Sequence, residues 1–294
     1  MADEIADISS VDALVAAFEK SSYVLDRALA TTVFLQLKLG KPLLIEGHAG
    51  VGKTDVAKVL SSILGTELIR LQCYEGLDVN SAVYEWNYQK QLLAINMHRE
   101  SAADADQQQK RIFGPDFLEE RPLLRAVRAQ QRAPVLLIDE VDRADEEFEA
   151  FLLELLSDFQ ITIPEMGTIK AAHRPFVILT SNRTRELSDA LKRRCLYHWI
   201  DYPSLEKESK IVRIKLPGIE EELAQQVVRF VHSLRASRLT KSPGVAETLD
   251  CIQSLQALGK NHLDEEAAEQ VLGTVVKSAD DFARLKSEGM SQLL

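Results

Sequence analysis

The sequence feature that most constrains this chain is a glycine-rich loop, Gly47-His48-Ala49-Gly50-Val51-Gly52-Lys53-Thr54. The loop follows an apolar run at residues 43–46 and precedes a segment with helical periodicity at residues 55–64. Glycines allow a backbone to wrap closely around a phosphate chain, so that inward-pointing N–H groups meet the phosphate oxygens. We therefore expect the whole loop to bind a nucleotide, with the Lys53 ammonium on the β- and γ-phosphates and the Thr54 hydroxyl on Mg²⁺.

Two further apolar runs end in polar residues that suit ATP hydrolysis. Residues 135–138 are followed by Asp139 and Glu140, and residues 176–181 are followed by Asn182. A carboxylate at a strand end can hold Mg²⁺ through its water shell, which is the role we expect for Asp139. Glu140 is expected to polarise the water that attacks the γ-phosphate. For Asn182 two interpretations stay open: it orients that water, or it caps the turn after the strand.

The order of apolar runs predicts an α/β fold. Helical periodicity occupies most of the first forty residues, and short apolar runs then alternate with helical or polar stretches. Runs that are apolar on both faces predict parallel strands covered by helices on two sides, hence a three-layer αβα domain. After Pro203 the periodicity is helical only, so we expect an αβα domain at residues 1–203 and a helical domain at 204–294. A polar loop is expected at residues 100–110. The predicted strands are 43–46, 68–73, 135–139, 176–181 and 196–202.

Composition limits the partners and the location that this chain can have. Lysine and arginine number 35 against 45 aspartates and glutamates, so the net charge of −10 argues against the nucleic-acid backbone as the main partner. No apolar run approaches the roughly 20 residues of a membrane helix. The acidic N-terminus predicts no secretion signal. Cys73, Cys195 and Cys251 lie far apart, which fits a reducing cytoplasm rather than a disulfide framework.

These motifs together are similar to those of AAA+ ATPases of the MoxR type. The resemblance is carried by the loop at 47–54, the acidic segment 139–143, Asn182 and the basic segment 189–194. It implies a sheet of order 5-1-4-3-2 followed by a helical lid, ATP and Mg²⁺ as cofactors, and assembly into a ring that is usually a hexamer. A narrower resemblance, to the MoxR-type ATPases of carbon monoxide dehydrogenase maturation, is carried by residues 69–76, 84–88 and 194–197.

The resemblance also assigns roles that the residues alone leave open. Arg193 or Arg194 would be the arginine finger that reaches a neighbouring subunit's nucleotide, with Arg194 favoured of the two; the alternative is a solvated basic turn. His48 is either a solvated side chain or a sensing group. Residues 242–245 read Ser-Pro-Gly-Val where many MoxR-type lids carry a phosphate-sensing arginine, so that role has no assigned residue. Alternating residues at 161–170 predict a β-hairpin.

The expected function is therefore Mg²⁺-dependent ATP hydrolysis by a cytoplasmic ring ATPase that remodels a partner protein. The resemblance implies a von Willebrand factor A domain protein as partner and a metalloenzyme of the carbon monoxide dehydrogenase type as client, whose cofactor maturation the ATPase assists as a chaperone. The alternative function is a nucleic-acid motor or loader, which the acidic balance disfavours.

Overall fold

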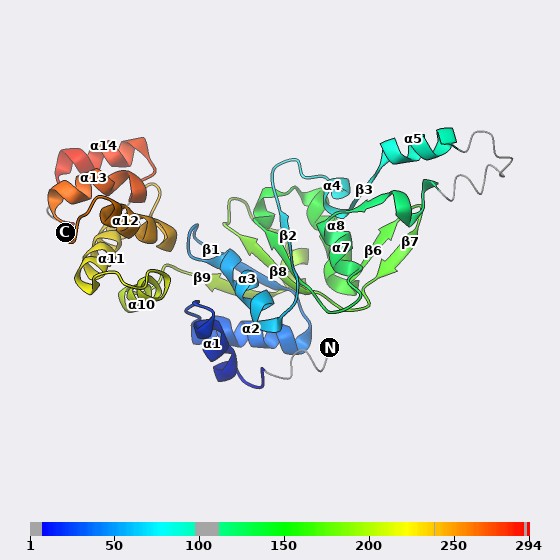
Figure 1. The fold of residues 1–294 in the computed structure, drawn as a ribbon, viewed down its shortest axis with the longest axis horizontal. Helices are drawn as coiled ribbons and strands as arrows, with labels where there is room; N and C mark the ends of the chain where they lie inside the picture. The colour runs from blue at the N-terminus through cyan, green and yellow to red at the C-terminus, as the bar shows by residue number, and fades with distance from the viewer. Residues whose placement is uncertain (1–7, 98–111, 238, 291–292) are drawn as a thin grey trace. The chain divides into compact units, whose positions relative to one another are not determined.

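The computed structural model describes residues 8–97, 112–237, 239–290 and 293–294, and Figure 1 shows its ribbon. The loop predicted at residues 100–110 lies outside the described residues. The helices are α1 (Val11–Lys20), α2 (Arg27–Leu39), α3 (Lys53–Leu64), α4 (Val79–Val83), α5 (Tyr88–Met97), α7 (Pro122–Val127), α8 (Glu146–Asp158), α9 (Asp189–Arg194), α10 (Leu205–Lys215), α11 (Glu221–Ala236), α12 (Val245–Ala257), α13 (Glu265–Val275) and α14 (Ala279–Glu288), with 3₁₀ turns η1 (Pro115–Phe117) and η2 (Val141–Arg143). The strands are β1 (Leu43–Gly47), β2 (Leu68–Gln72), β3 (Tyr84–Trp86), β4 (Leu118–Glu120), β5 (Val135–Asp139), β6 (Gln160–Ile163), β7 (Gly167–Lys170), β8 (Phe176–Ser181) and β9 (Leu196–Ile200).

The described residues fall into two compact units. The first, called the sheet unit, comprises the described residues of Met1–Leu14, Arg27–Glu46 and Ala57–His198. The second, called the helical unit, comprises Val15–Asp26, Gly47–Val56 and Trp199–Leu294, so it includes the glycine-rich loop. None of the described helices is both long enough and apolar enough to span a bilayer.

The predicted strands form one five-stranded sheet of order β2-β5-β8-β1-β9. When β1, β2, β5, β8 and β9 are numbered 1 to 5 in chain order, the sheet order from the β9 edge is 5-1-4-3-2, as expected. The pairs β2/β5, β5/β8 and β1/β8 are parallel, with Gln72 opposite Asp139 and Glu46 opposite Ser181. Parallel strands in this register end at one edge of the sheet, which collects the polar residues that follow β2, β5 and β8.

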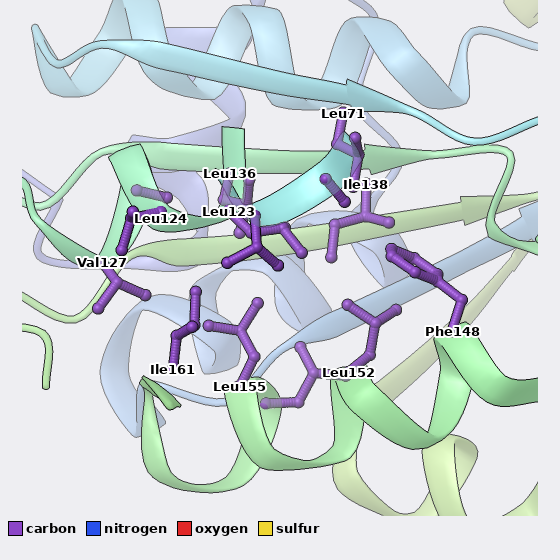
Figure 2. Close-up of a cluster of buried hydrophobic side chains, with 14 of the residues drawn as sticks. Leu71, Leu123, Leu124, Val127, Leu136, Ile138, Phe148, Leu152, Leu155 and Ile161 are labelled. Atoms are coloured by element: carbon purple, nitrogen blue, oxygen red, sulfur yellow. The ribbon is translucent and has the colours of Figure 1, made fainter. Parts of the chain in front are cut away.

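One hydrophobic core lies between a face of this sheet and helices α7 and α8. Leu136 and Ile138 of β5 point into it because successive side chains of a strand point to opposite faces. Val135 and Leu137 are also fully buried, so helices cover both faces of the sheet. Figure 2 shows the labelled members of the core: Leu71, Leu123, Leu124, Val127, Leu136, Ile138, Phe148, Leu152, Leu155 and Ile161.

Helix ends and hairpins follow local sequence signals. Asp145 is the N-cap of α8, and its Oδ1 accepts the backbone N–H of Phe148 at 2.8 Å, which satisfies an otherwise unpaired helix donor. Strands β6 and β7 pair antiparallel, so the predicted hairpin at 161–170 is confirmed, with its turn at residues 164–166.

The helical unit has a core of its own, built from α10, α11, α12, α13 and α14. All regular elements in its described residues beyond Pro203 are helices, as the periodicity predicted. A buried ion pair links α10 and α11: the Arg235 guanidinium donates to both oxygens of Glu208, at 2.6 and 2.9 Å. Thr248 of α12 donates to the same carboxylate at 2.6 Å, so three helices share one buried charge.

Candidate functional site

The glycine-rich loop has a backbone that only its glycines permit. Gly50 and Gly52 have φ values of +73° and +89°, a left-handed region that other residues rarely adopt. A Cβ on Gly47 would lie 2.2 Å from the backbone oxygen of Ile200, so no side chain fits there. Of the two apolar side chains between the glycines, that of Ala49 is exposed and that of Val51 is half-buried. The glycine pattern thus serves a close-fitting backbone, which is what a phosphate cradle requires.

Lys53 and Thr54 lie in the first turn of α3, which begins two residues before the predicted start of the helix at residue 55. The Lys53 side chain is buried and folds back over the loop, with its Nζ donating to the backbone oxygens of Gly47 at 2.8 Å and His48 at 2.6 Å. Thr54 is half-buried. A helix N-terminus with an adjacent ammonium attracts anions, so these residues fit the phosphates of a nucleotide, with a threonine hydroxyl available to Mg²⁺.

His48 is exposed, and its ring contacts two aromatic side chains. Its ring stacks on Tyr202, with centroids 4.3 Å apart and planes 7° apart, and meets Trp199 edge-on at 5.4 Å. Its Nε2 lies 3.6 Å from Asp201 Oδ1. The imidazole therefore ties the loop to the segment that follows β9.

A second attachment of the loop was missed from sequence. The backbone N–H of Val245, at the start of α12, donates to the Gly50 oxygen at 3.0 Å. Gly244 approaches so closely that a Cβ there would lie 2.7 Å from the Ala49 oxygen. The one signal in the sequence was the glycine that stands where the resemblance leads us to expect a phosphate-sensing arginine.

At the carboxyl edge of the sheet, Asp139 is buried and fully engaged by neighbours. Thr180 donates its hydroxyl to Oδ1 at 2.5 Å. Arg70 donates to Oδ2 twice, from Nε at 3.0 Å and from Nη2 at 2.6 Å. Carboxylate oxygens are the ligands that Mg²⁺ prefers, so Asp139 is of the residue type that fits a Mg²⁺ site.

Glu140 and Asn182 are brought together, as expected for two groups that act on one water. Asn182 Nδ2 donates to Glu140 Oε1 at 3.3 Å, and Gln72 Nε2 donates to Oε2 at 3.1 Å. Arg143 Nε lies 3.3 Å from Oε2. The Glu140 carboxylate is thus half-exposed, and it is held by Gln72, by Asn182 and by Arg143 of the following turn. A carboxylate that is both accessible and fixed in place suits a general base.

Arg193 and Arg194 are both exposed on the last turn of α9, but their surroundings differ. Arg194 Nε donates to Ser157 Oγ at 2.6 Å, and its Nη1 donates to the Ala190 oxygen at 2.9 Å. Arg194 is therefore fixed on its own subunit. Arg193 is the better placed of the two to reach another molecule.

Sequence reasoning missed other polar residues at the carboxyl edge, notably Arg70, Gln72 and Glu46. Glu46 is buried and accepts the hydroxyls of Ser181 and Tyr197, each at 3.1 Å. The signal for Arg70 and Gln72 was present in β2, where polar residues alternate with buried Ile69 and Leu71. Alternation shows which face a residue is on but not which neighbour it reaches.

The fold and the loop define a P-loop ATPase of the AAA+ class, which uses ATP with Mg²⁺. Residues 42–195 match the AAA domain family, dynein-related subfamily, and the chain belongs to that family. AAA+ ATPases generally work as ring oligomers.

Individual relatives are more distant. An uncharacterized protein of Staphylococcus epidermidis is 27% identical over 235 residues, covering 76% of this chain and 80% of the relative. One of Staphylococcus aureus is 27% identical over 238 residues, covering 76% and 81%. Among solved structures, the Holliday junction branch migration motor RuvB of Thermotoga maritima covers 90% of this chain and 70% of its own, at 16% identity and a TM-score of 0.47. A mutant of that protein gives 17% identity and a TM-score of 0.48, covering 90% and 71%.

Proposed function

We propose that this ATPase hydrolyses ATP and that two groups of residues take part: the loop Gly47–Thr54, and the polar residues at the ends of β5 and β8. Glu140 accepts a proton from the attacking water, Asn182 orients that water, and Lys53 binds the phosphates. Asp139 and Thr54 would hold Mg²⁺, which would supply positive charge to the phosphates. The observation that carries this proposal is the Asn182 Nδ2 to Glu140 Oε1 hydrogen bond at 3.3 Å, which joins the two water-handling groups.

Replacing Glu140 by glutamine tests this assignment. The amide keeps the size and the hydrogen-bonding shape of the carboxylate but cannot take a proton, so we expect phosphate release to fall about 10²- to 10⁴-fold while ATP binding is kept. Binding of a fluorescent ATP analogue separates the two effects. Normal turnover by this variant would remove Glu140 from the mechanism.

We further propose a MoxR-type ring, hexameric by resemblance, in which Arg193 completes the neighbouring subunit's site. Residues 204–294 would then act as a lid on an αβα domain at 1–203, and loss of the γ-phosphate would move the lid and so do work on a partner. Support comes from the exposed arginines at the end of α9. A chain that hydrolyses ATP only as a ring should lose specific activity on dilution, whereas constant specific activity at every concentration would exclude a shared site.

The client we propose is a metalloenzyme of the carbon monoxide dehydrogenase type, reached through a von Willebrand factor A domain protein in the cytoplasm. The segments 69–76, 84–88 and 194–197 support this, because they carry the narrower resemblance. The test is capture from native lysate with the ATP-trapped Glu140→Gln variant, with the wild-type chain as control. Recovery of a von Willebrand factor A protein that depends on ATP supports the proposal.

The alternative function is a nucleic-acid motor or loader, and the net charge of −10 disfavours it. Such a protein should bind single-stranded or duplex DNA with an affinity that falls steeply as salt rises. Salt-dependent DNA binding by the ATP-trapped variant, together with recovery of nucleic acid instead of protein from lysate, would favour this alternative.

A further inference from the structure

Arg70 has no place in the proposed chemistry, yet it forms an ion pair with Asp139 at 2.6 Å. It lies on β2, opposite Leu137 of β5. Its Nε and Nη2 both donate to Asp139 Oδ2, at 3.0 and 2.6 Å. The Arg70 side chain is 49% exposed, whereas that of Asp139 is 3% exposed. A half-exposed cation thus contacts a buried anion.

The oxygen that Arg70 occupies is one that a magnesium ion or its water shell would use. A carboxylate oxygen has two lone-pair directions, and both donors of Arg70 point at Oδ2. Oδ1 already accepts the Thr180 hydroxyl at 2.5 Å. Two cations that share one carboxylate repel each other, so a hydrated Mg²⁺ and Arg70 in this position oppose each other's binding.

We propose that Arg70 is a place-holding cation for Asp139. Arg70 pairs with the Asp139 carboxylate before Mg²⁺·nucleotide binds, and it moves off the carboxylate when the metal arrives. Arg70 is a positioning residue in this scheme, since it acts through Asp139. The inference rests on the proposed function, in which Asp139 holds Mg²⁺.

Gln72 extends this arrangement to the general base. Arg70 Nη2 donates to Gln72 Oε1, and Gln72 Nε2 donates to Glu140 Oε2 at 3.1 Å. The amide of Gln72 therefore lies between the arginine on Asp139 and the carboxylate of Glu140.

The experiment compares Mg²⁺ titrations of the full chain at saturating ADP, read by a fluorescent ADP analogue. In Arg70→Met the competing charge is gone, so half-saturation should occur at an Mg²⁺ concentration about three- to tenfold lower than in wild type. The matched control is Arg128→Met, which removes another arginine–carboxylate pair of the sheet unit, with Glu120 at 2.7 Å. That control should titrate like wild type.

Thermal unfolding gives a second readout that does not depend on activity. In EDTA, Arg70→Met should unfold at a lower temperature than wild type, because a buried carboxylate has lost a cation. The difference should shrink when Mg²⁺ and ADP are added. Arg70→Lys keeps a cation and should stay close to wild type in both measurements, which covers the case in which the methionine variant does not fold.

The place-holding role is overturned if Arg70→Met reaches half-saturation at the same Mg²⁺ concentration as wild type or at a higher one. It is also overturned if Arg70→Lys reaches half-saturation at a Mg²⁺ concentration well below that of wild type. Asp139→Asn distinguishes this failure from a failure of the proposed function. If Asp139→Asn titrates like wild type, Asp139 does not hold the metal and the proposed site itself is wrong. If Asp139→Asn requires more Mg²⁺ while Arg70→Met is unchanged, only the role of Arg70 is lost.

Discussion

At the scale of single residues, Glu140 carries the most unusual backbone of the site. Its φ of 54° and ψ of 49° are left-handed, a conformation that costs a non-glycine residue on the order of 1–3 kcal/mol. The backbone N–H of Glu140 donates to Thr180 Oγ1 at 2.9 Å, which helps to hold this conformation. The turn aims the carboxylate at Gln72 and Asn182 rather than along the strand. Strain of this kind is kept where geometry matters for function.

The two arginines of α9 should behave differently when they are replaced one at a time. We expect Arg193→Ala to lower the ATPase rate by about 10³-fold or more, because a guanidinium that stabilises charge in the transition state is lost. Arg194→Ala removes the bonds to Ser157 and Ala190, so it should mainly lower the melting temperature of the chain. Steady-state rates and thermal unfolding of both variants check this. The reverse ranking of rates would identify Arg194 as the finger.

Cys251 provides a prediction about pH. Burial in α12 raises the pKa of its thiol from 9.0 to about 11, so almost none of it is thiolate at pH 8. The pKa of the thiol is higher in the folded chain than in the unfolded chain, so the folded state is favoured while the thiol is neutral. This contribution to the free energy of unfolding is complete below about pH 9 and is lost as pH rises towards 11. We expect iodoacetamide to alkylate Cys251 at pH 8 far more slowly in the native chain than in urea. Equal rates would contradict this.

At the scale of elements, much of the central sheet could be predicted from sequence. The strands β1, β5 and β8 are continuous apolar runs because both of their faces are buried, and such runs are easily recognised. The short strands β3 and β4, of three residues each, carry too few positions for a period to show. The contact of α12 with the loop was also beyond prediction, since it depends on backbone atoms and on two glycines far apart in the chain.

Helix α12 should position the phosphate loop through Gly244. In Gly244→Ala the new Cβ would meet the Ala49 oxygen and Gly50, so α12 must shift away from the loop. We expect a higher KM for ATP, about tenfold, with a smaller change in kcat. Gly273→Ala is the matched control, because it lies in α13 with nothing within 4 Å of its Cβ. Its KM should equal that of wild type, and its stability should rise by about 0.5–1 kcal/mol. A KM for Gly244→Ala as low as that of the control would show that the contact does not position the loop.

At the scale of the whole molecule, the residues proposed for catalysis come from both units. The glycine-rich loop belongs to the helical unit, whereas Asp139, Glu140 and Asn182 belong to the sheet unit. Sequence patterns placed each part correctly within its own strand or loop. What they could not give was the set of side chains around each part, such as Arg70 on Asp139 and Tyr202 on His48, because those contacts join segments that are distant in the chain.

Mixing two inactive variants tests the central claim most directly, namely that ATP is hydrolysed with Glu140 from one subunit and an arginine of α9 from its neighbour. One variant carries Glu140→Gln, and the other carries Arg193→Ala with Arg194→Ala. In a mixed ring, some sites combine an intact Glu140 with an intact arginine pair, so the phosphate-release rate of the mixture should clearly exceed the rates of both variants alone. A mixture whose rate equals the average of the two separate variants at every ratio would contradict the account.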